Sequence, residues 1–100
     1  MSLPVAFKPA ALVEFEEAVA WYEAQRLGLG EEFKLEVKST LKRALTNPRF
    51  FQRVRGRAQR IRLHRFKKYA IYFAIKDGTF AVIAVFHGSR NPAELQPRLR

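Results

Sequence analysis

The sequence predicts one α+β domain over residues 1–100, with a short N-terminal strand, an antiparallel helical hairpin and a three- to four-stranded antiparallel β-meander. Apolar residues recur at helical spacing through residues 9–46, and the pattern changes to strand-like alternation and apolar runs after residue 50. Hydrophobic residues make up 48% of the 100 positions, which is enough for one modest core. Helices that precede a run of strands favour packing of the helices on one face of an antiparallel sheet.

The first strand and the first helix are expected within residues 3–27. Residues 3–7 place an apolar side chain at every second position, and Pro4 favours a sheet edge. Pro9 then starts a helix, because a missing N–H costs little in the first turn. The helix is expected to end near Leu27, since Gly28 suits the left-handed turn beyond a helix C terminus. Its apolar stripe comprises Ala11, Leu12, Phe15, Ala18, Val19 and Tyr22.

The second helix is expected from residue 30, where Glu31 and Glu32 lie near its positive end. It ends at 46–48, because the residue before Pro48 disfavours the helical region. Only a few residues separate the two helices, which favours an antiparallel hairpin. The second apolar stripe comprises Phe33, Val37, Leu41 and Ala44 or Leu45.

The meander is expected in the second half. Ile61 and Leu63 alternate with basic residues, and residues 69–75 form a dense run of β-forming side chains. Residues 80–86 are almost wholly apolar, which favours a strand with both faces covered. The Asp77-Gly78 dipeptide predicts a tight hairpin turn between these last two strands. Two smaller elements are also expected, a further strand at 50–54 and a short helical turn between Pro92 and Pro97.

Positive charge is concentrated in the second half of the chain. The formal net charge is +10, and residues 1–48 hold six Lys or Arg and seven Asp or Glu, whereas residues 49–100 hold thirteen and two. Residues 53–68 carry eight basic residues and no acidic one. A field of this sign attracts nucleic acid, acidic protein or anionic membrane, so charge alone leaves the partner open.

The composition excludes several classes of protein. There is no cysteine, so disulfide scaffolds and cysteine metal sites are excluded and a reducing compartment is favoured. Two histidines at unrelated spacing make no metal-ligand set. No apolar run approaches the roughly 18 residues that span a bilayer, and none near the start is long enough for a signal peptide. We therefore expect a cytoplasmic protein without a membrane partner, a metal or another cofactor.

Short motifs follow one another along nearly the whole chain. They are Glu17-Ala18, Trp21-Tyr22-Glu23, Gly28-Leu29-Gly30, Asn47-Pro48, Val54-Arg55-Gly56, Arg60-Ile61-Arg62-Leu63, Tyr69-Ala70-Ile71-Tyr72-Phe73 and Ala84-Val85-Phe86-His87, with Arg90 and Pro92 after them. In this order and spacing they resemble the RelE/ParE superfamily of toxins from type II toxin–antitoxin modules. The resemblance implies a RelE/ParE-like fold and a cognate antitoxin that wraps and neutralises the toxin. RelE-like members are ribonucleases that cut messenger RNA in the ribosomal A site, whereas ParE-like members poison DNA gyrase and have no accepted catalytic residues.

The residues favour the ParE-like branch. RNA cleavage without a metal needs a base for the 2′-hydroxyl, cations for the phosphorane and an acid for the leaving oxygen. Ala70 stands where RelE has an arginine after the tyrosine that matches Tyr69. Gly88 falls at another RelE arginine, although His87 or Arg90 could take that place with a small shift of register. No aromatic residue follows Asn91 to match the C-terminal tyrosine of RelE. Basic residues do fill the two strand positions at 60 and 62.

Arg60, Arg62 and His64 alternate with apolar residues, so they are expected to share one strand face. The face would carry a basic patch for a polyanion or an acidic partner, and the alternative interpretation is an exposed strand kept soluble by its charges. The candidate target-binding residues are Arg60, Arg62, His64, Arg65, Lys67, Lys68 and Arg90. The candidate antitoxin-binding residues are Trp21, Arg55, Arg60 and Arg62, with Trp21 expected to be half exposed beside a buried Tyr22.

The resemblance leaves three functions open. The favoured one is a ParE-like toxin of the plasmid-stabilisation kind, which binds gyrase and arrests growth. The alternative is a RelE-like mRNA interferase, a metal-independent endoribonuclease with Arg60, Arg62, His87 and Arg90 as its charge cluster, although His87 fits a structural hydrogen-bonding role better than that of a base. The second alternative is a non-toxic nucleic-acid-binding module, for which Lys and Arg suffice. None of the three takes a small-molecule substrate.

Overall fold

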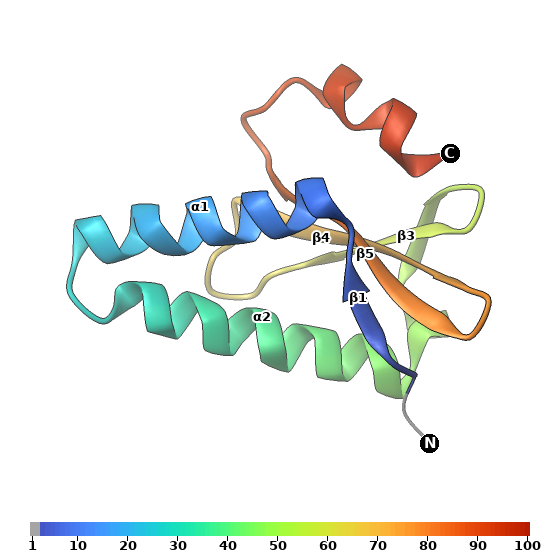
Figure 1. Ribbon diagram of the computed structural model, residues 1–100, viewed down its shortest axis with the longest axis horizontal. Helices are drawn as coiled ribbons and strands as arrows, with labels where there is room; N and C mark the ends of the chain where they lie inside the picture. Colours follow the sequence, from blue (N-terminus) through green and yellow to red (C-terminus); the bar gives the residue numbers. More distant parts are fainter. Residues whose placement is uncertain (1–2) are drawn as a thin grey trace.

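The computed structural model describes residues 3–100 and confirms the expected α+β architecture (Figure 1). The elements are β1 (Val5–Phe7), α1 (Pro9–Gln25), α2 (Leu29–Thr46), β2 (Gln52–Arg55), β3 (Ala58–Arg62), β4 (Tyr69–Lys76) and β5 (Thr79–His87), with short 3-10 turns η1 (Pro48–Phe50), η2 (Pro92–Glu94) and η3 (Gln96–Leu99). The sheet order is β1-β5-β4-β3-β2. Strands β2 to β5 form the antiparallel meander, and β1 joins β5 in parallel as an edge strand.

The two helices form the expected hairpin around a glycine turn. Gly28 has φ 89°, in the left-handed region that glycine adopts readily. The Glu23 carboxylate accepts hydrogen bonds from the N–H groups of Gly28 and Gly30, both at 2.9 Å. A Cβ at Gly30 would lie 2.7 Å from the Val19 carbonyl oxygen, so only glycine allows this close approach of the helices.

The main core lies between the helices and one face of the sheet. The predicted stripe of α2 is buried at Phe33, Val37, Leu41 and Ala44, and that of α1 at Ala11 and Ala18. These side chains pack against the strand residues Ile61, Leu63, Ile71, Phe73, Phe80, Val82 and Val85. The stripe was wrong at Leu12, which is 44% exposed on the side of α1 that neither α2 nor the sheet covers. Val5 is 40% exposed because β1 is the outermost strand.

The hairpin of β4 and β5 carries the expected turn and an irregularity that was not predicted. Asp77 and Gly78 have φ values of 52° and 73°, as a two-residue type I′ turn requires. Further along, the register of the two strands shifts at Tyr72/Phe73, which leaves Ile83 as an extra residue in β5. The bulge reverses the alternation of the strand, so Val82 faces the helices, whereas Ala84 and Phe86 face the other side.

A second, smaller core covers part of the outer face of the sheet, by which we mean the face opposite the helices. Leu95 and Leu99 of the C-terminal tail pack there against Ala58, Ile83, Ala84 and Phe86. Figure 1 shows this tail, in red, apart from the two helices. It forms two 3-10 turns, and the second includes Pro97, so the expected single turn between the two prolines was too short.

The structure corrects the predicted position of His64. Strand β3 ends at Arg62, and residues 63–68 form a loop, so His64 does not continue the strand face of Arg60 and Arg62. A hydrogen bond to a residue distant in the sequence holds the loop in place. The Arg65 N–H donates it to the Glu36 carboxylate of α2, at 2.8 Å. The Tyr69 N–H then donates to the Phe66 carbonyl oxygen, which closes the loop before β4.

Candidate functional site

The uncovered part of the outer face contains a hollow of about 460 Å³, which we call the sheet hollow. Its floor follows from the strand register. Arg60 pairs with Tyr72, and Arg62 pairs with Ala70, which in turn lies opposite Phe86. The small side chain of Ala70 leaves a depression between the arginines on one side and Phe86 on the other. The residues that line the sheet hollow are Arg60, Arg62, Lys67, Lys68, Tyr69, Ala70, Tyr72, Phe86, His87, Gly88 and Ser89.

Four cations of the sheet hollow are free to meet a partner. Arg60 donates one hydrogen bond of 3.0 Å to the neutral Gln52 side chain. Within residues 3–100, Arg60, Arg62, Lys67 and Lys68 take part in no ion pair. No Asp or Glu lines the hollow. A partner with negative charge therefore meets no internal competitor for these groups.

The other two cations of the predicted set are already paired. Arg65 forms an ion pair with Glu32 and lies over the Phe66 ring, 5.2 Å from its centroid. Arg90 is held by Glu14 of α1 and by Glu94 at 2.8 Å. Its guanidinium lies over the Phe86 ring at 4.4 Å. These two arginines are partly neutralised by internal ion pairs, unlike Arg60 and Arg62.

Glu14 is the centre of the ion-pair network and was not predicted. Its side chain is only 10% exposed, and it accepts hydrogen bonds from the Val85 N–H at 3.0 Å and from both terminal nitrogens of Arg98. Burial on its own would raise the pKa of Glu14, but hydrogen bonds from Arg98, Arg90 and Val85 outweigh it and hold the pKa below the usual 4.5. The sequence holds little signal for it, because Glu14 lies beside the predicted apolar stripe of α1 among other acids of the same helix, and its partners lie more than 70 residues away.

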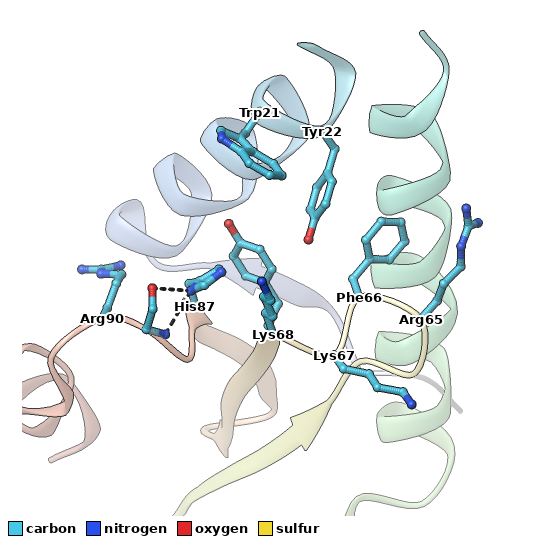
Figure 2. Close-up of a pocket in the computed structure, with 10 residues that line it drawn as sticks. Trp21, Tyr22, Arg65, Phe66, Lys67, Lys68, His87 and Arg90 are labelled. Atoms are coloured by element: carbon cyan, nitrogen blue, oxygen red, sulfur yellow. Dashed lines mark hydrogen bonds between the residues drawn. The ribbon is translucent and has the colours of Figure 1, made fainter. Parts of the chain in front are cut away.

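A second hollow of about 660 Å³, which we call the aromatic pocket, lies where α1 faces the loop between β3 and β4 (Figure 2). Tyr22 is its central ring, with centroids 5.1 Å from Trp21, 4.7 Å from Phe66 and 6.1 Å from Tyr69. Trp21 is 57% exposed, which agrees with the half-exposed side chain expected there. The residues that line the pocket are Trp21, Tyr22, Arg65, Phe66, Lys67, Lys68, Tyr69, His87, Ser89 and Arg90.

Ser89 fixes the tautomer of His87, which lies in the wall between the two hollows. The Ser89 N–H lies 3.0 Å from His87 Nδ1, and the Ser89 hydroxyl oxygen lies 2.8 Å from the same atom. A backbone N–H can only donate, so Nδ1 carries the lone pair and the proton of the neutral ring is on Nε2. In this tautomer Nε2 carries an N–H group that can donate a hydrogen bond, and the lone pair of Nδ1 already accepts one from Ser89.

The structure brings most of the predicted residues into the two hollows. Lys67, Lys68 and His87 line both of them, Arg60 and Arg62 line the sheet hollow alone, and Trp21, Arg65 and Arg90 line the aromatic pocket alone. His64 lines neither of these two hollows, and Arg55 is directed at the tail, where it donates a 3.3 Å hydrogen bond to Gln96. Sequence reasoning missed Tyr69, Tyr72 and Phe86 as site residues, because each lies within the pattern of an apolar strand.

Neither a metal site nor a membrane-spanning helix is found in the part of the chain that the structure describes. Within residues 3–100, no three His, Asp or Glu side chains lie close enough together to hold a metal ion. Neither helix in that part of the chain combines length and hydropathy in the way that crossing a bilayer requires.

The helical hairpin, the meander and the basic outer face define the class of protein as a RelE/ParE-superfamily toxin. Residues 5–92 match the model of a family described as "ParE toxin of type II toxin-antitoxin system, parDE". The chain therefore belongs to the ParE toxin family, and its expected membership of the superfamily is confirmed. It is the toxin component of a type II module, and the family implies a cognate antitoxin as its partner. A comparison with curated proteins gave no match.

Proposed function

We propose that this toxin acts in the cytoplasm by binding DNA gyrase through the sheet hollow, without chemistry of its own, and that a cognate antitoxin neutralises it. The observation that carries the proposal is the set of four unpaired cations around a hollow without acids, at Arg60, Arg62, Lys67 and Lys68. Arginine and aromatic side chains contribute much of the binding energy in protein interfaces. The lining of the sheet hollow combines the arginines with the half-buried ring of Tyr72 and the buried ring of Phe86.

The contacts of His87 and Arg90 favour binding over catalysis. A general base must have a free lone pair within reach of the proton that it takes. The Ser89 N–H donates to Nδ1 of His87 at 3.0 Å, so this ring atom already accepts a hydrogen bond within the protein. Arg90, the last member of the nuclease cluster, is held by Glu14 and does not line the sheet hollow. The arrangement therefore supports a protein that recognises a partner by charge and shape.

A supercoiling assay with purified gyrase tests the proposal. The wild-type protein should inhibit gyrase, and an Arg60→Ala/Arg62→Ala variant should need at least about ten-fold more protein, because central arginines contribute strongly to interfaces. The matched control is Arg53→Ala/Arg57→Ala, which removes the same charge from exposed residues that line a different hollow. No inhibition by excess wild-type protein would reject gyrase as the target. Equal losses in both variants would reject the sheet hollow as the contact surface.

One observation favours the alternative of an mRNA interferase. Arg60, Arg62 and His87 line the same hollow, so two cations and an imidazole lie together as RNA cleavage requires. This function predicts codon-dependent cuts of messenger RNA in a translation extract, and the cuts should vanish in the Arg62→Ala variant. A non-toxic nucleic-acid-binding module would instead show steep salt dependence of binding without growth arrest on expression.

The antitoxin is expected to neutralise the toxin by covering its basic surface. An acidic and apolar segment that orders as it binds would match the exposed Trp21 and the charges of Arg55, Arg60 and Arg62. Co-expression of the antitoxin should restore growth, and its segment should protect the amide hydrogens of β3 from exchange with solvent.

A further inference from the structure

We propose that the aromatic pocket is an anchor site for an acidic peptide segment that carries a large apolar side chain. The inference rests on the proposed function in one respect, because the segment that we assign to the pocket belongs to the neutralising antitoxin. It goes further in naming the site and the chemistry of the occupant. The sheet hollow remains the surface for the target.

The walls of the pocket suit an apolar anchor. A volume of about 660 Å³ falls in the range of about 300–1,000 Å³ that is common for binding pockets. The rings of Tyr22, Phe66 and Tyr69 form one continuous cluster, and Trp21 packs edge-on against Tyr22. Trp21 keeps 57% of its surface exposed, although it is the largest apolar side chain in the protein. An occupant that covers Trp21 would therefore bury a large apolar area.

Two hydroxyl groups of the pocket have no hydrogen-bond partner within the part of the chain that the structure describes. Within residues 3–100, the hydroxyl groups of Tyr22 and Tyr69 make no hydrogen bond to the protein. Burial raises the pKa of both hydroxyl groups, so they stay protonated near neutral pH. His87 adds the N–H of Nε2. Each of these three groups can donate a hydrogen bond to an occupant rich in acceptors, such as a peptide with carboxylates.

The rim supplies the charge that selects an acidic occupant. Lys67 and Lys68 stand at the edge without an ion pair in the described chain, and no Asp or Glu lines the pocket. Figure 2 shows Trp21 and Tyr22 on one side of the pocket and Lys67 and Lys68 on the other, so an anchor side chain and a neighbouring carboxylate would each meet a matching wall. Binding of a nucleic-acid strand needs cations that follow the backbone along a groove. Here the free cations are two consecutive residues at one edge, which favours a peptide.

The protein contains its own reporter for the test, because Trp21 is its only tryptophan. Three short synthetic peptides without tryptophan should be titrated while the emission of Trp21 is followed: one with Glu and two Phe anchors, one with the Phe replaced by Ser, and one with the Glu replaced by Gln. The first should shift the emission to the blue and protect Trp21 from acrylamide quenching. Each of the other two should bind at least about ten-fold more weakly, because one lacks the aromatic anchors and the other lacks the carboxylates. Equal affinity of all three, or no change in emission, would overturn the proposal.

Two variants and a competing ligand sharpen the test. The Lys67→Gln/Lys68→Gln variant should bind the acidic Phe peptide at least about ten-fold more weakly, whereas the matched Arg53→Gln/Arg57→Gln variant should change affinity less than about three-fold. A similar loss in both would mean that net charge alone attracts the peptide. A short poly-dT oligonucleotide that shifts the Trp21 emission when the acidic peptide does not would assign the pocket to nucleic acid. Failure of the wild-type protein in the supercoiling assay tests the proposed function separately, since the peptide titration contains no gyrase.

Discussion

Replacement of Glu14 by Gln should cause the largest loss of stability among single changes of charge in this protein. The side chain is 10% exposed and accepts hydrogen bonds from Val85, Arg90 and Arg98. Glutamine can still accept from the Val85 N–H, but it leaves the two guanidinium groups without a counter-charge. Removal of one partner from a buried ion pair costs about 3–5 kcal/mol. Arg98 and Arg90 are 22% and 37% exposed and regain part of their hydration, so we expect a loss of about 2–3 kcal/mol.

The pH dependence of the effect has a definite sign. The pKa of Glu14 is lower in the folded protein than the ordinary 4.5, so the ionised carboxylate favours the folded state. That contribution is complete above the unfolded pKa and is lost as the pH falls through the folded pKa. The gap in stability between the wild-type protein and Glu14→Gln should therefore be largest near neutrality and should shrink in acid.

Urea and thermal denaturation, each followed by circular dichroism at several pH values, measure the loss of stability and its pH dependence. At neutral pH the melting temperature of Glu14→Gln should fall by about 10–20 °C, since 1 kcal/mol corresponds to about 4–8 °C in a domain of this size. The control is Glu94→Gln, which removes the other acid that pairs with Arg90 but is 53% exposed and should cost less than about 1 kcal/mol. Equal losses in the two variants, or a gap that stays constant into acid, would refute the account of the Glu14 network.

Three further substitutions test the close approach of the helices, a buried hydroxyl group and the backbone of the last hairpin turn. Gly30→Ala should destabilise the protein by about 1–3 kcal/mol in urea denaturation, because its Cβ would lie 2.7 Å from the Val19 carbonyl oxygen; an unchanged midpoint would refute the close approach of the helices. Thr40→Val should raise stability by about 1 kcal/mol, because the buried Thr40 hydroxyl has no hydrogen-bond partner in the described chain, and a lower midpoint would contradict this. Gly78→Ala should cost about 1–2 kcal/mol through its φ of 73° alone, since no atom lies within 4 Å of the added Cβ. Thermal unfolding of Gly78→Ala should show that loss without broadening of the transition.

Features that depend on neighbouring residues could be predicted from the sequence. The apolar stripe of α2 and the end of α1 before Gly28 each follow from side chains within one or two turns. The turn at Asp77-Gly78 likewise needs only two residues that tolerate positive φ. The two stretches of helix and the change to strands were enough to define the order of elements, and with it the resemblance to the toxin superfamily.

Features that depend on distant residues could not be predicted. The end of β3 before His64 depends on Glu36 of α2, which binds the Arg65 N–H across 29 positions of sequence. The bulge at Ile83 depends on the register of β4 against β5, and a one-residue shift in register reverses which side chains face the core. The sheet hollow exists because Ala70 lies between Arg62 and Phe86 in the ladder, a neighbourhood that no local pattern reveals.

The position of the acids explains why some cations of this basic protein are paired and others are free. Residues 49–100 hold only two acids, so carboxylates for their thirteen cations must come mainly from the helices. Glu32 of α2 reaches Arg65 in the loop. Glu14 reaches Arg90 and Arg98 past the edge of β5, because β1 pairs with β5 only at residues 80–82 and leaves the following edge open. Arg60 and Arg62 lie on the outer face, and the sheet stands between them and the carboxylates of the helices. The sheet itself thus separates the cations that stabilise the fold from those left for a partner.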